Sequence, residues 1–87
     1  MGKILIVDDN RLNTVATKKV LQKAGHQVDG VLRAKMAIKL LNNREYDIIL
    51  LEQNIPDMTG ISFLLYLQGM QIEKKPIVCM MSNNHSL

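Results

Sequence analysis

Three carboxylates in this chain follow apolar segments at places where a metal ion could bind. Asp8 and Asp9 come directly after the apolar run KILIV, and Glu52 follows the run DIILL. If the two runs are neighbouring parallel strands, their carboxyl ends meet at one edge of the sheet and bring these side chains together. Crowded carboxylates repel one another, and a hard divalent cation such as Mg²⁺ relieves that repulsion through oxygen ligands. The spacing therefore predicts a cation site at this edge.

The same residues also admit a purely structural interpretation. Asp8 and Asp9 precede an expected helix and can cap it, because a carboxylate accepts hydrogen bonds from the free N–H groups of the first turn. The positive end of the helix dipole favours them there as well. Glu52 would then be a solvated side chain at a strand end. From the residues alone, both interpretations remain open.

The segments around these carboxylates alternate between short apolar runs and amphipathic stretches. Continuous β-branched and aliphatic runs predict buried strands, and apolar residues three and four apart predict helices. The expected strands are Lys3–Val7, His26–Val28, Asp47–Leu51 and Pro76–Met81, and the expected helices are Arg11–Ala24, Val31–Asn42 and Ile61–Gly69. Within the first helix Leu12, Ala16 and Val20 form an apolar stripe, and lysines spread over the outer side. The second strand alternates as an edge strand does.

This β-α-β-α-β-α-β order predicts an α/β fold with a parallel sheet and right-handed crossovers. A chain of 87 residues forms one domain with a thin core. Aromatic residues make up only 3% of it, so the interior is expected to be aliphatic. Residues 82–87 are polar and are expected to be a tail.

The composition excludes several classes of protein. One cysteine, Cys79, rules out a disulfide framework within the chain, and in its apolar strand it is expected to be a small core residue. The sequence contains neither a signal peptide nor a long apolar run, which predicts a cytoplasmic protein without a membrane partner. The net charge of +3 permits contact with an acidic partner. Nucleic acid is not an expected partner, because no binding motif is present.

Several segments together resemble the receiver domain of response regulators in two-component signalling. They are KILIVDDN, the helix pattern AxxAIxLL before YDIILL, and the turn NIPDMTG, and the similarity runs from Lys3 to about Met81. The resemblance implies a flavodoxin-like, doubly wound sheet with strand order 2-1-3-4. It also implies a chain truncated before the last helix, strand and helix of the family's fold.

The resemblance assigns roles to residues near the expected cation site. Asp8 and Asp9 match the acidic pair that binds Mg²⁺ in the family, and the backbone carbonyl of Asn54 matches a further ligand. Glu52 would be the remaining ligand, and Mg²⁺ is expected to bind only weakly to these four residues. Pro56 and Gly60 match the turn that shapes the pocket.

Two positions depart from the family's pattern. Glu52 stands where the family has its phosphoaccepting aspartate, and its carboxylate lies about 1.5 Å further from the backbone. Met81 stands at the position of the switch hydroxyl and cannot donate a hydrogen bond to a phosphoryl oxygen. The family's conserved lysine, from its fifth strand, has no counterpart. These departures predict a pseudo-receiver without enzymatic activity, in which Glu52 supplies part of the negative charge of a phosphate.

The fourth expected strand would be an exposed apolar edge, and edges of this kind pair with other strands. We therefore expect a homodimer formed through the same strand of a second copy. The residues of this edge are Ile77, Val78, Cys79, Met80 and Met81. Two alternatives remain open: a working Mg²⁺-dependent receiver that takes phosphate at Glu52 or Asp57, and a fragment of a longer regulator.

Overall fold

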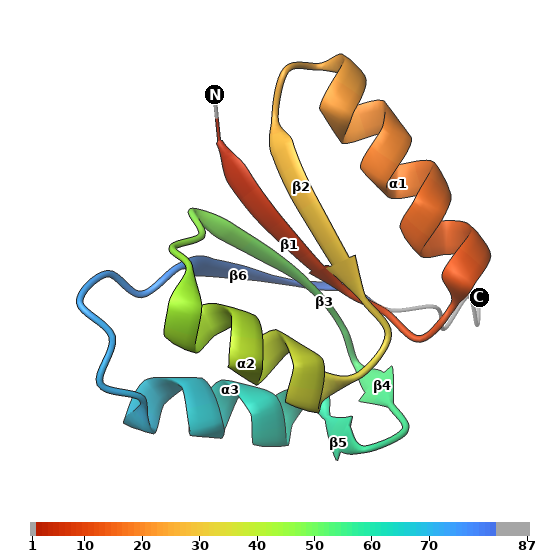
Figure 1. Ribbon diagram of the computed structural model, residues 1–87. Helices are drawn as coiled ribbons and strands as arrows, with labels where there is room; N and C mark the ends of the chain where they lie inside the picture. Colours follow the sequence, from red (N-terminus) through yellow and green to blue (C-terminus); the bar gives the residue numbers. More distant parts are fainter. Residues whose placement is uncertain (1, 82–87) are drawn as a thin grey trace.

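Four parallel strands form the centre of the molecule, and helices lie on both faces of their sheet (Figure 1). The computed structural model describes residues 2–81. The strands β1 (Lys3–Val7), β2 (Gln27–Val31), β3 (Ile48–Glu52) and β6 (Ile77–Met81) lie in the order β2-β1-β3-β6. The helices α1 (Arg11–Lys23), α2 (Ala34–Asn43) and α3 (Gly60–Gly69) lie between successive strands of this sheet. The predicted α/β class, flavodoxin-like arrangement and strand order 2-1-3-4 are confirmed, with β6 as the fourth strand.

A small antiparallel hairpin, which the sequence pattern did not predict, occupies the turn after β3. It consists of β4 (Asn54–Ile55) and β5 (Met58–Thr59), with Pro56 and Asp57 at its tip. Strands of two residues are too short to show an alternation of polar and apolar side chains. The hairpin carries the chain from the end of β3 to the first turn of α3.

The boundary between β2 and α2 differs from the prediction. The strand continues to Val31 and the helix begins at Ala34, whereas the sequence predicted a strand ending near Val28 and a helix from Val31. Pairing with β1 explains the longer strand, because Gly30 and Val31 lie in register with Ile6 and Val7. The predicted edge position of β2 is confirmed.

The two faces of the sheet are covered to different extents (Figure 1). α2 and α3 pack over the larger cluster of buried residues, which includes Ile49 and Phe63. On the other face a smaller cluster is formed by Ile4, Ile6 and Val28, with Leu21 of α1 packed against it. Within residues 2–81, α1 is the only helix on this smaller face.

The apolar stripe of α1 faces solvent rather than the sheet. Leu12 is 81% exposed and Val20 is 67% exposed, and the only buried residue of the helix is Thr14. The Thr14 hydroxyl donates to the carbonyl oxygens of Asp8 (3.0 Å) and Asn10 (2.9 Å), which turns this side of the helix toward the strand ends. The hydrogen bonds of Thr14 therefore turn a different face of α1 toward the sheet from the one that carries the apolar stripe.

The prediction that Cys79 is a core residue is wrong. Cys79 is exposed, and Ile77 on the same face of β6 is 72% exposed. Val78 and Met80 alternate with them and pack against the larger cluster beneath α2 and α3. This end of the smaller face has no helix over it in the described part of the chain, so apolar side chains there meet solvent.

Candidate functional site

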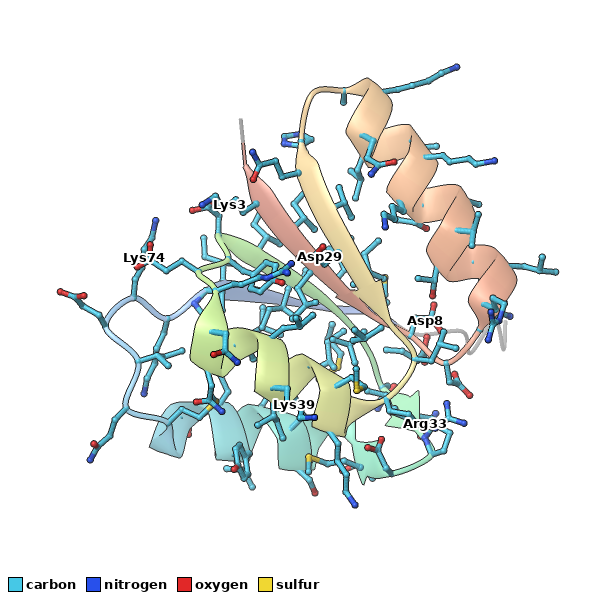
Figure 2. The ribbon with its side chains drawn as sticks, in the orientation of Figure 1. Lys3, Asp8, Asp29, Arg33, Lys39 and Lys74 are labelled. Carbon is cyan, nitrogen blue, oxygen red and sulfur yellow. The ribbon has the colours of Figure 1, made fainter. Side chains whose placement is uncertain are left out.

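Asp8 and Glu52 lie at the carboxyl ends of the neighbouring strands β1 and β3. Val7 pairs with Leu51, so Asp8 and Glu52, the residues that follow this pair, stand side by side at the ends of strands that lie about 4.8 Å apart. By the alternation of side chains, both point to the face that α1 partly covers. Figure 2 shows Asp8 at the end of β1 that lies far from Lys3. The sequence prediction that these strand ends are neighbours is thus confirmed.

The Glu52 carboxylate is buried and turned back onto its own backbone. The residue is 3% exposed, and its Oε1 accepts a hydrogen bond from the Gln53 N–H at 3.1 Å. Its Oε2 is buried and has no hydrogen-bond partner in the described part of the chain. The expectation of a solvated Glu52, which belonged to the structural interpretation, is therefore wrong.

The capping of α1 is performed by Asn10 and supported by Asp8. The Asn10 side chain accepts from the Asn13 N–H at 3.0 Å, and Asp8 Oδ1 accepts from the Asn10 N–H at 2.9 Å. Asp8 is 4% exposed, whereas Asp9 is exposed. Of the two acids expected to act together, one is buried against the cap and the other faces solvent.

The expected metal ligands do not form a ready-made Mg²⁺ site. Mg²⁺ needs carboxylates that reach it together with several waters, and the one unpaired oxygen of Glu52 is enclosed. Asn54, the expected carbonyl ligand, is exposed in β4. Among residues 2–81, no group of three His, Cys, Asp or Glu side chains is arranged to hold a metal ion.

Met81 lies in register with Glu52 across the β3–β6 pair. The Gln53 N–H also donates to the Met81 carbonyl oxygen at 3.1 Å, which holds the two strand ends together. The neighbouring Met80 lies close to Gly60, where a Cβ would come within 2.9 Å of the Met80 sulfur. The Met80 side chain thus lies against the start of α3 at this edge of the sheet, and no hydroxyl is present at position 81.

Asp57, at the tip of the hairpin, caps α2 from a distance in the sequence. Its Oδ1 accepts from the Ala34 N–H at 2.9 Å and its Oδ2 from the Lys35 N–H at 3.0 Å. Desolvation would raise the pKa of Asp57, but the hydrogen bonds from Ala34 and Lys35 outweigh it and hold that pKa below its ordinary value. Sequence reasoning missed this role, because Arg33, the N-cap residue, makes no side-chain cap bond and the partner is 23 residues away.

A second polar cluster joins Asp29, in the middle of β2, to the segment that precedes β3 (Figure 2). Asp29 accepts from the Tyr46 hydroxyl at 2.5 Å and from Arg44 at 3.0 Å beside a cavity of about 740 Å³. Burial first, and the hydrogen bond to Asp29 second, raise the pKa of Tyr46 to about 12. His26 accepts from the Gly2 N–H at 3.1 Å. We assign this cluster to the fold, since its polar groups satisfy one another.

Comparison with known proteins identifies the same family that the motifs resemble. The family described as the response regulator receiver domain matches residues 4–87. Probable histidine kinase 1 of Oryza sativa subsp. indica is 35% identical over 70 residues, which is 80% of this chain and 7% of that protein. The aerobic respiration control sensor protein ArcB of Escherichia coli is 40% identical over 58 residues, or 67% of this chain and 8% of that protein.

A solved structure agrees with this assignment. A CheY-like receiver domain from Methylobacillus flagellatus superimposes with a TM-score of 0.91 at 26% identity, covering 97% of this chain and 71% of that one. The chain thus spans less than a tenth of these two relatives and about seven tenths of this solved receiver. No helix within residues 2–81 is long and apolar enough to cross a bilayer.

Proposed function

This chain belongs to the response regulator receiver domain family, and on that premise we propose that it acts without being phosphorylated. In this proposal it is a pseudo-receiver, a non-enzymatic interaction module of two-component signalling. It works by associating with itself and with a signalling partner. Glu52 supplies a permanent negative charge where the family places a phosphorylated aspartate.

The burial of Glu52 is the observation that carries the proposal. A phosphoacceptor must present a carboxylate oxygen to the phosphoryl donor in line with the leaving group. Glu52 instead bonds its Oε1 to the Gln53 N–H and encloses its Oε2. Met81, in register with it, has no hydroxyl to stabilise the charge that develops in the transition state. Both features support loss of phosphotransfer.

The free edge of β6 supports self-association. β6 is the last strand in the sheet order and pairs with β3 alone among the described strands. Exposed apolar residues Ile77 and Cys79 lie along it. An unpaired apolar edge is a template for another strand, and the same edge of a second copy would continue the sheet across a twofold axis.

A second candidate function is that of a working receiver. The neighbouring carboxylates Asp8 and Glu52 favour it, because together they preserve part of the family's acidic cluster. Asp57 is a further acceptor candidate, since it is exposed, although both of its oxygens accept hydrogen bonds from α2.

Intact mass after incubation with acetyl phosphate and Mg²⁺ separates the two functions. A pseudo-receiver gives no species heavier by about 80 Da, the mass of a phosphoryl group. A heavier species that disappears in Glu52→Gln would overturn the proposal and assign the acceptor to Glu52. Its disappearance in Asp57→Asn alone would overturn it in favour of Asp57. A receiver with an intact acceptor aspartate, treated in parallel, verifies that the donor is active.

A further inference from the structure

The outer layer formed by α2 and α3 carries positive charge and no negative charge. Neither helix contains an Asp or Glu, and α3 contains no charged residue at all. Lys35 and Lys39 of α2 are exposed, and neither takes part in an ion pair in residues 2–81. Figure 2 shows Lys39 on α2, which lies next to α3. Other basic side chains are engaged, since Arg44 and Lys74 pair with Asp29 and Asp47.

Exposed apolar side chains lie on α3, the helix next to α2 (Figure 2). Ile61, Leu65 and Tyr66 are 58%, 65% and 50% exposed, although side chains this large are more often buried. A shallow groove of about 490 Å³ opens where the C-terminal halves of α2 and α3 meet. It is lined by Asn42, Leu65, Tyr66, Gly69, Met70 and Gln71. Gly69 leaves open space in this groove, because a Cβ there would meet nothing within 4 Å.

We propose that this α2–α3 groove binds an acidic amphipathic helix of another protein. Such a helix would place apolar side chains against Leu65 and Tyr66 and carboxylates beside Lys35 and Lys39. Helix-in-groove recognition combines an apolar anchor with complementary charge at the rim in this way. The groove lies on the face of the sheet away from α1 and involves neither Glu52 nor the β6 edge, so the inference is independent of phosphorylation.

The charges of the chain itself argue against a second copy as the occupant. α1, α2 and α3 all lack acidic residues, so no helix of a second copy would bring carboxylates to Lys35 and Lys39. Asp8 and Glu52 are buried, and Asp57 is held by α2. Asp29 and Asp47 are already in ion pairs. The acids left over are Asp9, Glu45 and Glu73, which stand on three separate loops.

Binding of designed helical peptides tests the proposal. The probe is a stapled helix with Leu and Phe on one face and Glu at the flanking positions, and its matched control carries Lys in place of every Glu. We expect the acidic peptide to shift amide resonances of α2 and α3 in ¹⁵N-labelled protein, and the basic peptide to bind at least about tenfold more weakly. Tyr66→Ala is expected to weaken the acidic peptide about tenfold, as loss of an aromatic anchor does.

A charge-matched pair of variants separates local from general attraction. The double variant Lys35→Glu/Lys39→Glu is expected to weaken the acidic peptide about tenfold, since each reversal removes one rim contact and adds a repulsion. Lys19→Glu/Lys23→Glu changes the net charge equally on exposed positions of α1 and is expected to leave affinity within about twofold.

Three results would overturn the inference. The first is equal binding of the two peptides, or no binding at millimolar concentration. The second is a set of shifted resonances confined to α1 or to β6. The third is co-sedimentation with phosphatidylserine vesicles that depends on Lys35 and Lys39 while the acidic peptide stays unbound, which would identify a membrane surface as the occupant.

Discussion

Glu52 and Asp8 stand side by side, and neither forms an ion pair with a basic side chain within residues 2–81. Both are nearly inaccessible to water. A buried polar atom without a hydrogen-bond partner costs about 1–3 kcal/mol, and Glu52 Oε2 is such an atom. Proteins keep local costs of this kind chiefly at functional positions. The unpaired oxygen therefore singles out this strand end as a candidate functional position.

Replacing the Glu52 carboxylate with an apolar side chain of similar length is expected to stabilise the fold. Glu52→Met removes the unsatisfied Oε2 and the crowding with Asp8, so the free energy of unfolding should rise by about 1 kcal/mol. Urea denaturation at neutral pH measures the change. Glu45→Met, at an exposed position, is the control and should change stability by no more than about 0.5 kcal/mol. A loss of stability in Glu52→Met would show that Oε2 has a partner.

Magnesium is expected to stabilise the chain only slightly. Asp9 faces solvent and the free oxygen of Glu52 is enclosed, so a dissociation constant of about 10 mM or weaker is expected. At 10 mM Mg²⁺ the gain in unfolding free energy then stays below about 0.4 kcal/mol. Thermal denaturation with MgCl₂ against NaCl of equal ionic strength provides the measurement. A gain above about 1 kcal/mol that disappears in Asp8→Asn would contradict the expectation.

The sequence predicted which residues gather at this site but not how they are oriented. Parallel strands place their carboxyl ends together, so Asp8 and Glu52 could be brought to one edge from their positions alone. The turn of Glu52 back to the Gln53 N–H depends on side-chain packing around position 52, which no local pattern encodes. The contact of Asp57 with α2 joins residues far apart in the sequence, and it follows only from the folded hairpin.

At the scale of elements, the β4–β5 hairpin and α2 are joined by one side chain. Asp57 occupies two N–H groups of the first turn of α2, which are the groups that a helix leaves without internal partners. The hairpin begins two residues after Glu52, so this contact connects the strand end to the α2–α3 layer. Movement of the hairpin would therefore change the start of α2.

Removal of the Asp57 carboxylate is expected to weaken α2 in a manner that depends on pH. Asp57→Ala should cost about 1 kcal/mol at pH 7, the usual value of an N-cap contact. The folded pKa of Asp57 is lowered, so this contribution is complete above the unfolded value of about 4 and is lost as the pH falls through the folded value. Urea denaturation from pH 7 to pH 3 should show the unfolding free energies of the wild-type protein and Asp57→Ala converging. Glu73→Ala, at an exposed position, is the control. A stability difference between the wild-type protein and Asp57→Ala that does not change with pH would contradict the capping role of Asp57.

The apolar pattern of α1 predicted a helix correctly and its buried face wrongly. A period of 3.6 residues shows that a stripe exists but not which surface it meets. In the described structure α1 is anchored by Thr14, whose hydroxyl bonds to the β1–α1 turn, and the stripe containing Leu12 and Val20 remains exposed. The position of the helix is thus set by polar contacts that the hydrophobic pattern does not contain.

At the scale of the whole molecule, apolar surface is distributed unevenly around the sheet. α2 and α3 cover one face, whereas the other face has exposed apolar residues on both α1 and β6 in the described part of the chain. The edge of β6 that no other strand of residues 2–81 occupies borders this poorly covered face. Pairing of two such edges would satisfy their backbone groups and bring two exposed apolar surfaces next to each other.

The single cysteine of the chain allows the proposed homodimer to be tested directly. Cys79 is the middle residue of β6, so antiparallel pairing of two full strands about a twofold axis places the two Cys79 residues opposite each other. Opposed residues have Cα atoms about 4.5–5.5 Å apart, which is within the range of a disulfide. Mild oxidation should therefore produce a covalent dimer, and sedimentation velocity should detect a reversible dimer at micromolar concentration under reducing conditions.

Charged substitutions on the same edge distinguish this dimer from nonspecific association. Ile77→Lys/Cys79→Lys places two cations on the edge and is expected to give a monomer, because like charges meet across the twofold axis. Leu65→Lys, at an apolar position on α3 whose exposure is similar to that of Ile77, serves as the control and should leave the dimer intact. Wild-type protein that is monomeric at micromolar concentration would exclude the dimer. A dimer that Leu65→Lys disrupts and the β6 variant does not would place the interface away from β6.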